Sequence, residues 1–417
     1  MNLELDAAYD ELRADVRQFC TSSWPLSGDA AALPLREQEI LWQEAAIAAK
    51  FLHRSVPSEY GGGGLPSDPL AEAIIAQEFV GSAVPFLSST PNGPRFLVPT
   101  LLECGTEDQR RKYIWPTLTG RLNWCQGYSE PGAGSDLASL RAQAVLDGDE
   151  WLINGQKTWT SLADRANMMF GLFRTERERE RHAGISFLLV PMDSAGLSVR
   201  PIRGINGSTE FCEVFFDNVR IPAENIVGKR GEGWKVSKAV LKYERLQLAD
   251  SSYVRGQFDG LVALARRTRR NDRRAIDDQH IRQRLSTIEG WVTTQEYSVA
   301  RILTALDQGR DDDVSAELLI GKLLGSHSQQ EIARLAVDII GSESMLEPSA
   351  EEISILQFMT PDPTNGDWAN RYFASLAVVL GGGTSNIHRN IVGERLLGLP
   401  RDLRMEARTA HAPSGHG

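Results

Sequence analysis

The order of apolar patterns along the chain predicts an α+β protein with an N-terminal helical domain, a central β domain and a C-terminal four-helix bundle. Apolar residues recur at helical spacing up to residue 120 and again from Val236 onwards. Between these regions, alternating apolar and polar residues with tight turn signals are typical of strands. We therefore expect domains at 1–122, 123–235 and 236–404, followed by a flexible polar tail at 405–417.

Composition limits the class of protein. The 417 residues exceed one ordinary core and suit two or three domains. A formal net charge of −10 disfavours nucleic acid as a partner. No apolar run approaches the roughly 18 residues of a membrane span, so we expect neither a span nor a signal peptide. The cysteines are far apart in the sequence, so we expect no metal-ligand pairs. Scattered cysteines also favour a reducing, cytoplasmic compartment. They are Cys20, Cys104, Cys125 and Cys212.

In the first domain, helical spacing predicts helices over Leu3–Cys20 and Glu37–Phe51. Tyr60 is followed by four glycines, Gly61–Gly64, which break a helix and predict a loop. A phosphate-binding loop would end in Lys followed by Ser or Thr, and this one does not. We interpret the glycine run as a connection between helices.

The central domain shows strand patterns. Residues 141–160 alternate around Asp147-Gly148-Asp149 and around Asn154-Gly155, which predicts strands joined by tight turns. Ile185–Val190 and Phe211–Val219 are further strand candidates. No strand leads into a Gly-x-Gly-x-x-Gly helix start, which disfavours a nicotinamide-binding fold.

Helical spacing returns in four segments that are each long enough to cross a four-helix bundle. They are Val236–Arg266, Asp277–Leu306, Ser315–Ile340 and Trp368–Arg395. The chain has no internal repeat of fixed period, which disfavours a helical repeat array.

Two segments of the central domain carry candidate binding chemistry. In the segment Tyr128–Asp136, Gly132 and Gly134 let backbone approach a ligand, and consecutive N–H groups suit a phosphate or an electron-rich ring. A polar connection into the β domain explains the same residues equally well. In Gln156–Ser161, a Trp between hydroxyl residues can cover a flat ring while the hydroxyls reach its edge. Alone, this segment is better explained as a strand end with a half-buried Trp159.

Together, the two segments resemble the two flavin-contacting signatures of the acyl-CoA dehydrogenase family. The resemblance extends to Tyr60–Gly64, to Phe215–Pro222 with Gly228 and Gly231–Trp234 after it, and to Gly381–Arg389. It implies a tetrameric FAD enzyme of lipid metabolism and fatty acid β-oxidation. Such an enzyme oxidises an acyl-CoA thioester to the 2-enoyl-CoA and passes electrons to an electron-transfer flavoprotein. The protein supplies position and polarisation, and the flavin supplies the redox chemistry.

The resemblance also identifies a candidate base. Most of the family has a Glu before the Gly-Thr of the last signature, but this chain has Gly382. A smaller branch carries the base on the first long C-terminal helix, directly before an Arg, which matches Glu244 and Arg245. Glu244 would remove the α proton, and Arg245 would support the site. The Gly382 N–H, with Gly383 beside it, would contact the thioester carbonyl. The alternative is that Glu244 is a solvated surface residue.

Other site residues follow by position from the resemblance. Gln126 to Ser135 would run beside the flavin, Ser161 would approach its N5, and Ser135 would also contact the CoA chain. The substrate-binding set would be Ser135, Arg245, Gly382 and Gly383. The cofactor-binding set would be Gln126, Tyr128, Ser129, Gly134, Ser135, Trp159, Thr160, Ser161, Gln279, Thr384, Ser385 and Asn386.

Two family signatures are altered, and both normally contact FAD across a subunit interface. An expected Arg-x-x-Phe-Gly is replaced by Thr268–Asp272, and a glycine-rich adenosine loop by Asp338–Ser344. The run Arg266, Arg267, Arg269 and Arg270 could substitute, although a solvated helix end explains it better. Alternatively, the chain forms a mixed tetramer with a related subunit, or it binds flavin weakly.

Three hypotheses therefore remain. The first is an active dehydrogenase, alone or as a homo-oligomer, that uses Glu244 and FAD. The second is a subunit of a hetero-oligomeric acyl-CoA dehydrogenase with limited activity of its own. The third is a flavin oxidase or monooxygenase on the same fold. In the family that the chain resembles, a base on the first long helix is associated with branched or bulky acyl groups, so the resemblance implies such a substrate.

Overall fold

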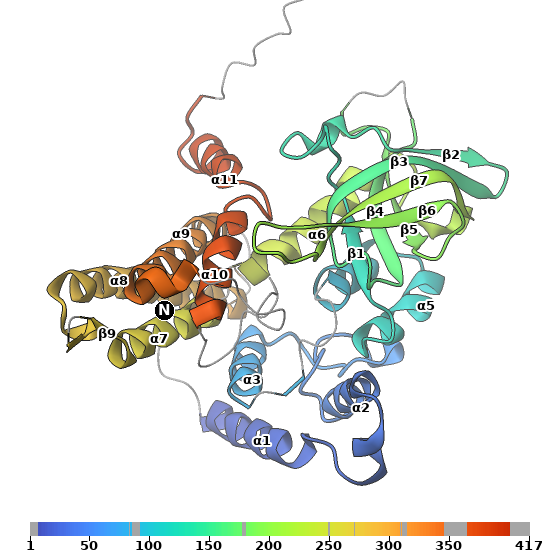
Figure 1. Cartoon of the computed structure of the whole chain (residues 1–417). Helices are drawn as coiled ribbons and strands as arrows, with labels where there is room; N and C mark the ends of the chain where they lie inside the picture. Colours follow the sequence, from blue (N-terminus) through green and yellow to red (C-terminus); the bar gives the residue numbers. More distant parts are fainter. Residues whose placement is uncertain are drawn as a thin grey trace, which may run out of the picture.

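A computed structural model shows three parts in the predicted order: N-terminal helices, a central sheet and a C-terminal helical bundle (Figure 1). The predicted fold class is confirmed. The structure describes residues 7–82, 84–85, 92–176, 181–248, 251–270, 272–308, 310, 315–345 and 365–400. The predicted tail at 405–417 lies outside these residues.

The N-terminal helices pack through an aromatic core. Val16, Trp42 and Phe79 are buried together, and the Trp42 and Phe79 rings meet edge to face at 5.3 Å. Burial of one such side chain contributes about 1.5–3 kcal/mol. The helices are α1 (Ala7–Ser23), α2 (Leu35–Ala48), α3 (Pro69–Gly81), α4 (Val98–Cys104) and α5 (Glu107–Leu118).

The glycine run after Tyr60 connects α2 to α3, as predicted. Gly61 has a left-handed backbone with φ +90°, and a Cβ there would lie 2.2 Å from Cε3 of Trp115. At Gly62, a Cβ would lie 2.2 Å from the Val56 carbonyl oxygen. The chain therefore needs glycine for close packing against its own atoms, and not for a ligand.

The central part is one sheet in the order β6-β7-β3-β2-β4-β5-β8, with β1 pairing to β4. Strands β3 and β7 alternate between buried and more exposed residues, whereas the first six residues of β4 and of β5 are all buried. The strands are β1 (Trp124–Gly127), β2 (Gln143–Asp147), β3 (Glu150–Ser161), β4 (Met168–Arg174), β5 (Ile185–Pro191), β6 (Leu197–Ile202), β7 (Phe211–Pro222) and β8 (Ile226–Val227).

The prediction of a turn at Asn154–Gly155 is wrong. Both residues lie inside β3, at a register irregularity against β7. Gly155 is required by a close approach, since a Cβ on it would lie 2.7 Å from Cα of Ala142. The predicted turn around Gly148 is confirmed, and it joins β2 to β3.

The C-terminal helices are α6 (Gly233–Leu248), α7 (Ser252–Arg267), α8 (Gln279–Asp307), α9 (Ser315–Ile340), α10 (Asn365–Val378) and α11 (Ser385–Ile391). Two of the four predicted segments are each divided in two. The segment Val236–Arg266 forms α6, which ends at Leu248, and α7, for which Ser251 is the N-cap residue. The segment Trp368–Arg395 is interrupted by the left-handed Gly382 and Gly383. The bundle core is built by α7, α8, α9 and α10.

Helix α6 lies between the sheet and the bundle (Figure 1). Its residues Val236 and Val240 join a core that also contains Ile114 of α5 and Phe170 and Phe187 of the sheet. The same helix contacts α4, β5 and α9. The structure therefore holds α6 at the meeting point of all three parts.

Candidate active site

The loop after β1 exposes its backbone. Glu130 and Ala133 close a tight turn, with Glu130 N to Ala133 O at 2.9 Å and Ala133 N to Glu130 O at 3.0 Å. A Cβ on Gly132 or Gly134 would meet no atom within 4 Å. The fold itself does not require glycine at either position. The two glycines instead leave open space beside the backbone.

The end of β3 turns Trp159 outward. Lys157 pairs with Val214 and Thr160 with Cys212, so Thr158 and Trp159 stand opposite a single residue of β7 as a β-bulge. Trp159 has φ +57° and is 59% exposed, and its ring meets Phe211 edge to face at 6.0 Å. It is therefore more exposed than the half-buried strand end that its sequence suggested.

Thr160 and Ser161 follow the bulge. Thr160 is completely buried, and its Oγ1 has no hydrogen-bond partner among the described residues. Ser161 is half-buried and pairs with Phe211 at the edge of β3. A buried hydroxyl without a partner is costly, so a bound polar group at this position would fit the site.

The two signatures lie side by side. Thr158 N donates to Ser129 O at 2.9 Å, which links the loop to the β3 bulge. Gln126 pairs with Phe170 in the sheet. The Tyr128 ring packs edge to face on Phe170 and Phe187, so a contact from Tyr128 to a bound group would come from its main chain. Gln126–Ser135 and Trp159–Ser161 thus form one continuous region.

A buried ion pair, which the sequence did not reveal, lies beneath this region. Lys157 is completely buried, and its Nζ donates to Glu130 Oε1 at 2.8 Å and to Tyr128 O at 3.2 Å. Burial lowers the pKa of Lys157 to about 8, against the opposing effect of Glu130. The only sequence signal was the presence of a Lys and a Glu within the two signatures, and both types are normally exposed.

The turn between α10 and α11 holds the C-terminal candidates. Gly382 and Gly383 have φ +64° and +85°, and the Gly382 carbonyl lies 3.1 Å from His388 Nε2. Thr384 caps α11, with Ile387 N donating to its Oγ1 at 3.2 Å. Ser385 N donates to Val379 O at 2.9 Å, while Asn386 is exposed. The fold therefore uses the Thr384 hydroxyl as a helix cap.

The turn between α10 and α11 belongs to the helical bundle. Helix α11 packs on α9, and Figure 1 shows it beyond the end of the bundle, apart from the sheet. Gln279 is the exposed first residue of α8, next to the β9–β10 hairpin (Arg269–Arg270 and Arg273–Arg274). Figure 1 shows that hairpin at the end of the bundle farthest from the sheet. Within one chain, Gln279 is not brought to the β-domain residues.

The basic run ends in that hairpin. Arg266 and Arg267 close α7, and Arg269 and Arg270 form the first hairpin strand, all exposed. The altered loop at Asp338–Ser344 is also exposed from Gly341 to Glu343. Both altered signatures therefore lie on the surface of the bundle.

Glu244 and Arg245 lie on α6, but their side chains are outside the described part of the structure. The backbone is helical there, and Val236, Val240 and Glu244 follow at intervals of four residues. The Cα of Glu244 is therefore on the face of α6 that carries the two buried valines.

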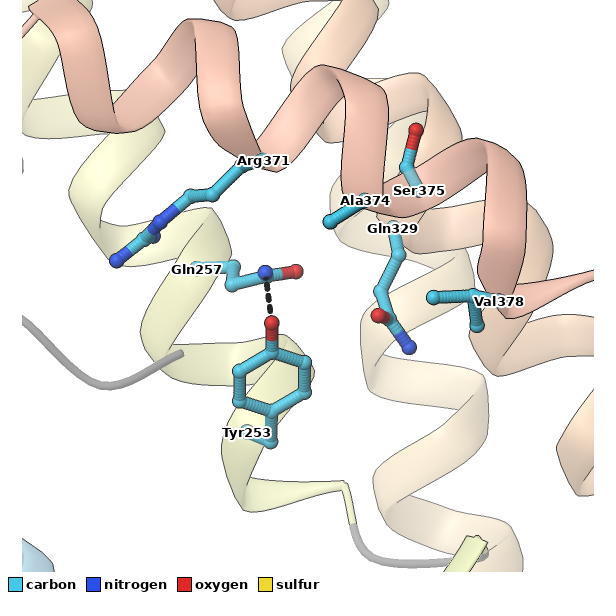
Figure 2. A pocket seen from close by; sticks show the side chains of 7 residues that line it. All are labelled: Tyr253, Gln257, Gln329, Arg371, Ala374, Ser375 and Val378. Carbon is cyan, nitrogen blue, oxygen red and sulfur yellow. Dashed lines mark hydrogen bonds between the residues drawn. The ribbon is translucent and has the colours of Figure 1, made fainter. Parts of the chain in front are cut away.

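A separate polar cavity lies inside the bundle (Figure 2). Gln257 donates to the Tyr253 hydroxyl on α7, and both face Arg371 of α10. Burial raises the pKa of Tyr253, so its hydroxyl stays protonated. The Arg371 guanidinium lies 5.0 Å from the centroid of the Trp368 ring. None of the predicted site residues lines this cavity.

Among the described residues, no helix is both long and apolar enough to cross a membrane. Within the same residues, no cluster of three or more His, Cys, Asp or Glu side chains could hold a metal ion.

Comparison with known proteins matches most of the chain to one family. Family models for the N-terminal, middle and C-terminal domains of acyl-CoA dehydrogenase match residues 6–121, 125–219 and 231–397. The acyl-CoA dehydrogenase IpdE1 of Mycobacterium tuberculosis is 38% identical over 409 residues, covering 95% of this chain and 99% of that protein. IpdE1 of Mycolicibacterium smegmatis is 36% identical over 417 residues, covering 94% and 98%.

Solved structures agree. The Tcur3481–Tcur3483 steroid acyl-CoA dehydrogenase matches with a TM-score of 0.77 at 27% identity, covering 96% of this chain and 100% of that one. A chain of the ChsE4–ChsE5 complex from Mycobacterium tuberculosis matches with a TM-score of 0.75 at 27% identity, with the same coverage. With all three domains matched in order and relatives alike along nearly their full length, the chain belongs to the acyl-CoA dehydrogenase family of oxidoreductases.

Proposed function

We propose that the protein carries out FAD-dependent α,β-dehydrogenation of an acyl-CoA thioester, with Glu244 removing the α proton. The observation that supports it best is the continuous region formed by the Tyr128–Asp136 loop, which is exposed at residues 131–132 and 134–136, and the outward Trp159. Buried Thr160 Oγ1, which has no partner among the described residues, fits a bound polar group there. FAD, when bound, would accept the β hydride at N5.

The residues of this chain would bind the flavin and orient the substrate. The loop Gln126–Ser135 would hold the flavin through main-chain donors, and Trp159 would cover the ring. Gly382 N, which has no backbone acceptor among the described residues, would donate to the thioester carbonyl and stabilise the developing enolate. Arg245 and Gly383 would support this end of the substrate, and Ser135 the CoA chain.

A carboxylate is the appropriate base because it can accept the α proton within a site that excludes water. The Cα of Glu244 shares the face of α6 that is buried among the other two parts. Gly382 offers no side chain for this role. These two facts support Glu244, and Ser161 remains our candidate near flavin N5.

The test of the base compares Glu244→Gln with Glu232→Gln, a control that changes an exposed Glu just before α6. Both variants are assayed with a dye acceptor and a panel of acyl-CoA thioesters. We expect Glu244→Gln to lower turnover by about 10²–10⁴-fold, the usual contribution of a general base, while the flavin spectrum stays unchanged. Full turnover in Glu244→Gln would refute the assignment.

Branched or bulky acyl groups, and an electron-transfer flavoprotein as acceptor, are the classes that we propose to test first. Oxygen uptake measured alongside dye reduction separates a dehydrogenase from a flavin oxidase or monooxygenase. A rate that depends on oxygen and not on the dye would contradict the dehydrogenase proposal.

A second candidate is that the chain acts as one subunit of a mixed tetramer. Gln279 lies at the end of the bundle farthest from the β-domain residues, so its contact with the same FAD requires a neighbouring chain. Both altered signatures lie close to the start of α8: Arg269 and Arg270 form β9 of the hairpin that precedes it, and Asp338 pairs with Arg284 of α8. The ChsE4–ChsE5 structure is a complex of two different proteins, which motivates a search for a related partner. A colourless chain that gains flavin only on co-expression would support this candidate.

A further inference from the structure

We infer that Lys157 and Glu130 are positioning residues of the flavin site: their buried pair holds the Tyr128–Asp136 loop and the Trp159 bulge in register as one surface. The inference deepens the proposed function and rests on it, because it takes these two segments as the flavin contacts.

The pair joins four separate segments of the β domain. Lys157 on β3 donates to Glu130 and to the Tyr128 carbonyl in the loop. The Glu130 carboxylate accepts from Arg141 N at 2.6 Å and from Ala142 N at 2.9 Å, on the approach to β2. Lys157 Nζ also lies 5.1 Å from the centroid of the Phe173 ring on β4.

The position of the pair matches this role. The hydrogen bond from Thr158 N to Ser129 O connects the residues that directly follow Lys157 and precede Glu130. The next residue along β3 is the outward Trp159. Loss of the pair would therefore release the loop and the bulge from each other, at the place where both would meet the flavin.

Fold stability alone gives a weak reason for a charged pair here. A buried ion pair is often no more stabilising than apolar side chains of similar volume, because both charges lose their hydration. Fixing one arrangement of two segments is a use in which such a pair has an advantage over apolar packing. Removing only one partner leaves the other charge buried and unpaired, which also destabilises the fold. Flavin binding is therefore compared only in variants whose β4–β5 ladder keeps its wild-type hydrogen exchange.

Protonation provides a distinguishing signature. The charged groups around Lys157 are Glu130 and, through Glu130, Arg174, which donates to Ala138 O at 2.8 Å. The pKa of Lys157 is lowered to about 8. Above that pH the ammonium loses its charge and the hold on the loop weakens. The pKa of Lys157 is lower in the folded protein than in the unfolded chain, so the free energy of unfolding rises with pH above 8. Weaker flavin binding over the same pH interval would therefore not come from unfolding.

The experiment measures FAD dissociation by flavin fluorescence in the full chain, isolated with its partner subunit if one proves necessary. The variants are Lys157→Met, Lys157→Arg, Glu130→Gln and the control Arg220→Met, which removes an exposed pair with Asp147 and Glu150 on the same sheet. We expect Lys157→Met and Glu130→Gln to weaken FAD binding at pH 7 by about tenfold or more, as for loss of a charge-assisted hydrogen bond. Arg220→Met should have no effect.

The pH arm separates positioning from a general loss of structure. Wild-type affinity should fall between pH 7 and 9, and Lys157→Arg, whose charge persists, should remove that fall. Lys157→Met should also be insensitive to pH over this interval. Unchanged FAD affinity in Lys157→Met, or a pH dependence that survives it, would overturn the inference.

Hydrogen exchange keeps the two proposals distinguishable. In Lys157→Met, the amides of Arg141, Ala142 and Thr158 should exchange faster, while those of the β4–β5 ladder should not change. This readout needs no flavin. A wild-type protein that never binds flavin would refute the proposed function. The hydrogen-exchange measurement would still show whether the Lys157–Glu130 pair holds the loop. Unchanged exchange at all three amides counts against it.

Discussion

At the scale of single residues, Trp159 is expected to contribute to flavin binding but little to the stability of the fold. Its φ of +57° is unfavourable for a residue with a Cβ, and most of its ring is exposed. The fold therefore gains little from this side chain, which is typical of strain retained at a functional site.

We predict that Trp159→Gly changes the free energy of unfolding by no more than about 1 kcal/mol, because relief of the backbone conformation offsets the lost ring contact with Phe211. FAD affinity should fall clearly in the same variant. Urea unfolding and flavin fluorescence measure the two effects. A large loss of stability would show that Trp159 is primarily structural.

Gly61 shows the opposite case, a residue required only by packing. We predict that Gly61→Ala costs about 2–4 kcal/mol, from a left-handed backbone and a Cβ placed against Trp115. Gly132→Ala is the matched control, since its Cβ meets no atom within 4 Å. It should leave the unfolding midpoint nearly unchanged. Equal destabilisation by both substitutions would contradict this explanation.

At the scale of elements, the junction of α1 and α3 depends on a charge cluster. Glu78 Oε1 lies 2.6 Å from Arg13 Nη1, and Oε2 lies 2.6 Å from Arg17 Nε. Burial alone would raise the pKa of Glu78, but Arg17 and Arg13 outweigh it and hold the pKa below its ordinary value. The stabilisation is therefore complete above the unfolded pKa of 4.5 and is lost as pH falls through the lower folded pKa.

We predict that Glu78→Gln lowers the free energy of unfolding at pH 7 by about 1–3 kcal/mol, allowing for screening of the partly exposed arginines. The difference from wild type should shrink below pH 4.5. Glu44→Gln, which removes a more exposed pair with Arg121, is the control and should cost less. A constant difference across the acid range would argue against the charge cluster.

Helix boundaries also belong to this scale. Apolar spacing runs through Val236–Arg266, so it could not reveal where α6 ends and α7 begins. Periodicity reports which face is buried and not whether the partner on that face changes. Here the partner does change: Val236 and Val240 pack on the other two parts of the molecule, whereas Val254 and Phe258 pack in the bundle.

At the scale of the whole molecule, the candidate FAD contacts are divided among the sheet, the turn between α10 and α11, and the start of α8 beside the β9–β10 hairpin. We predict that the chain, kept monomeric as checked by sedimentation, binds FAD and FMN with similar affinity. The reason is that its β-domain residues can contact only the flavin half. An assembled oligomer should prefer FAD. A strong FAD preference in the monomer would show that one chain holds the adenine half unaided.

The α+β order, the family and the two candidate flavin-contacting segments could be predicted from the sequence, because local spacing and contiguous motifs are properties of neighbouring residues. The sequence also determined that Gly382 cannot act as a base. How those segments meet could not be predicted, because it depends on contacts between distant parts of the chain. The Lys157–Glu130 pair, the hydrogen bond from Thr158 to Ser129 and the bulge that exposes Trp159 join residues about thirty positions apart, across strands whose register depends on packing.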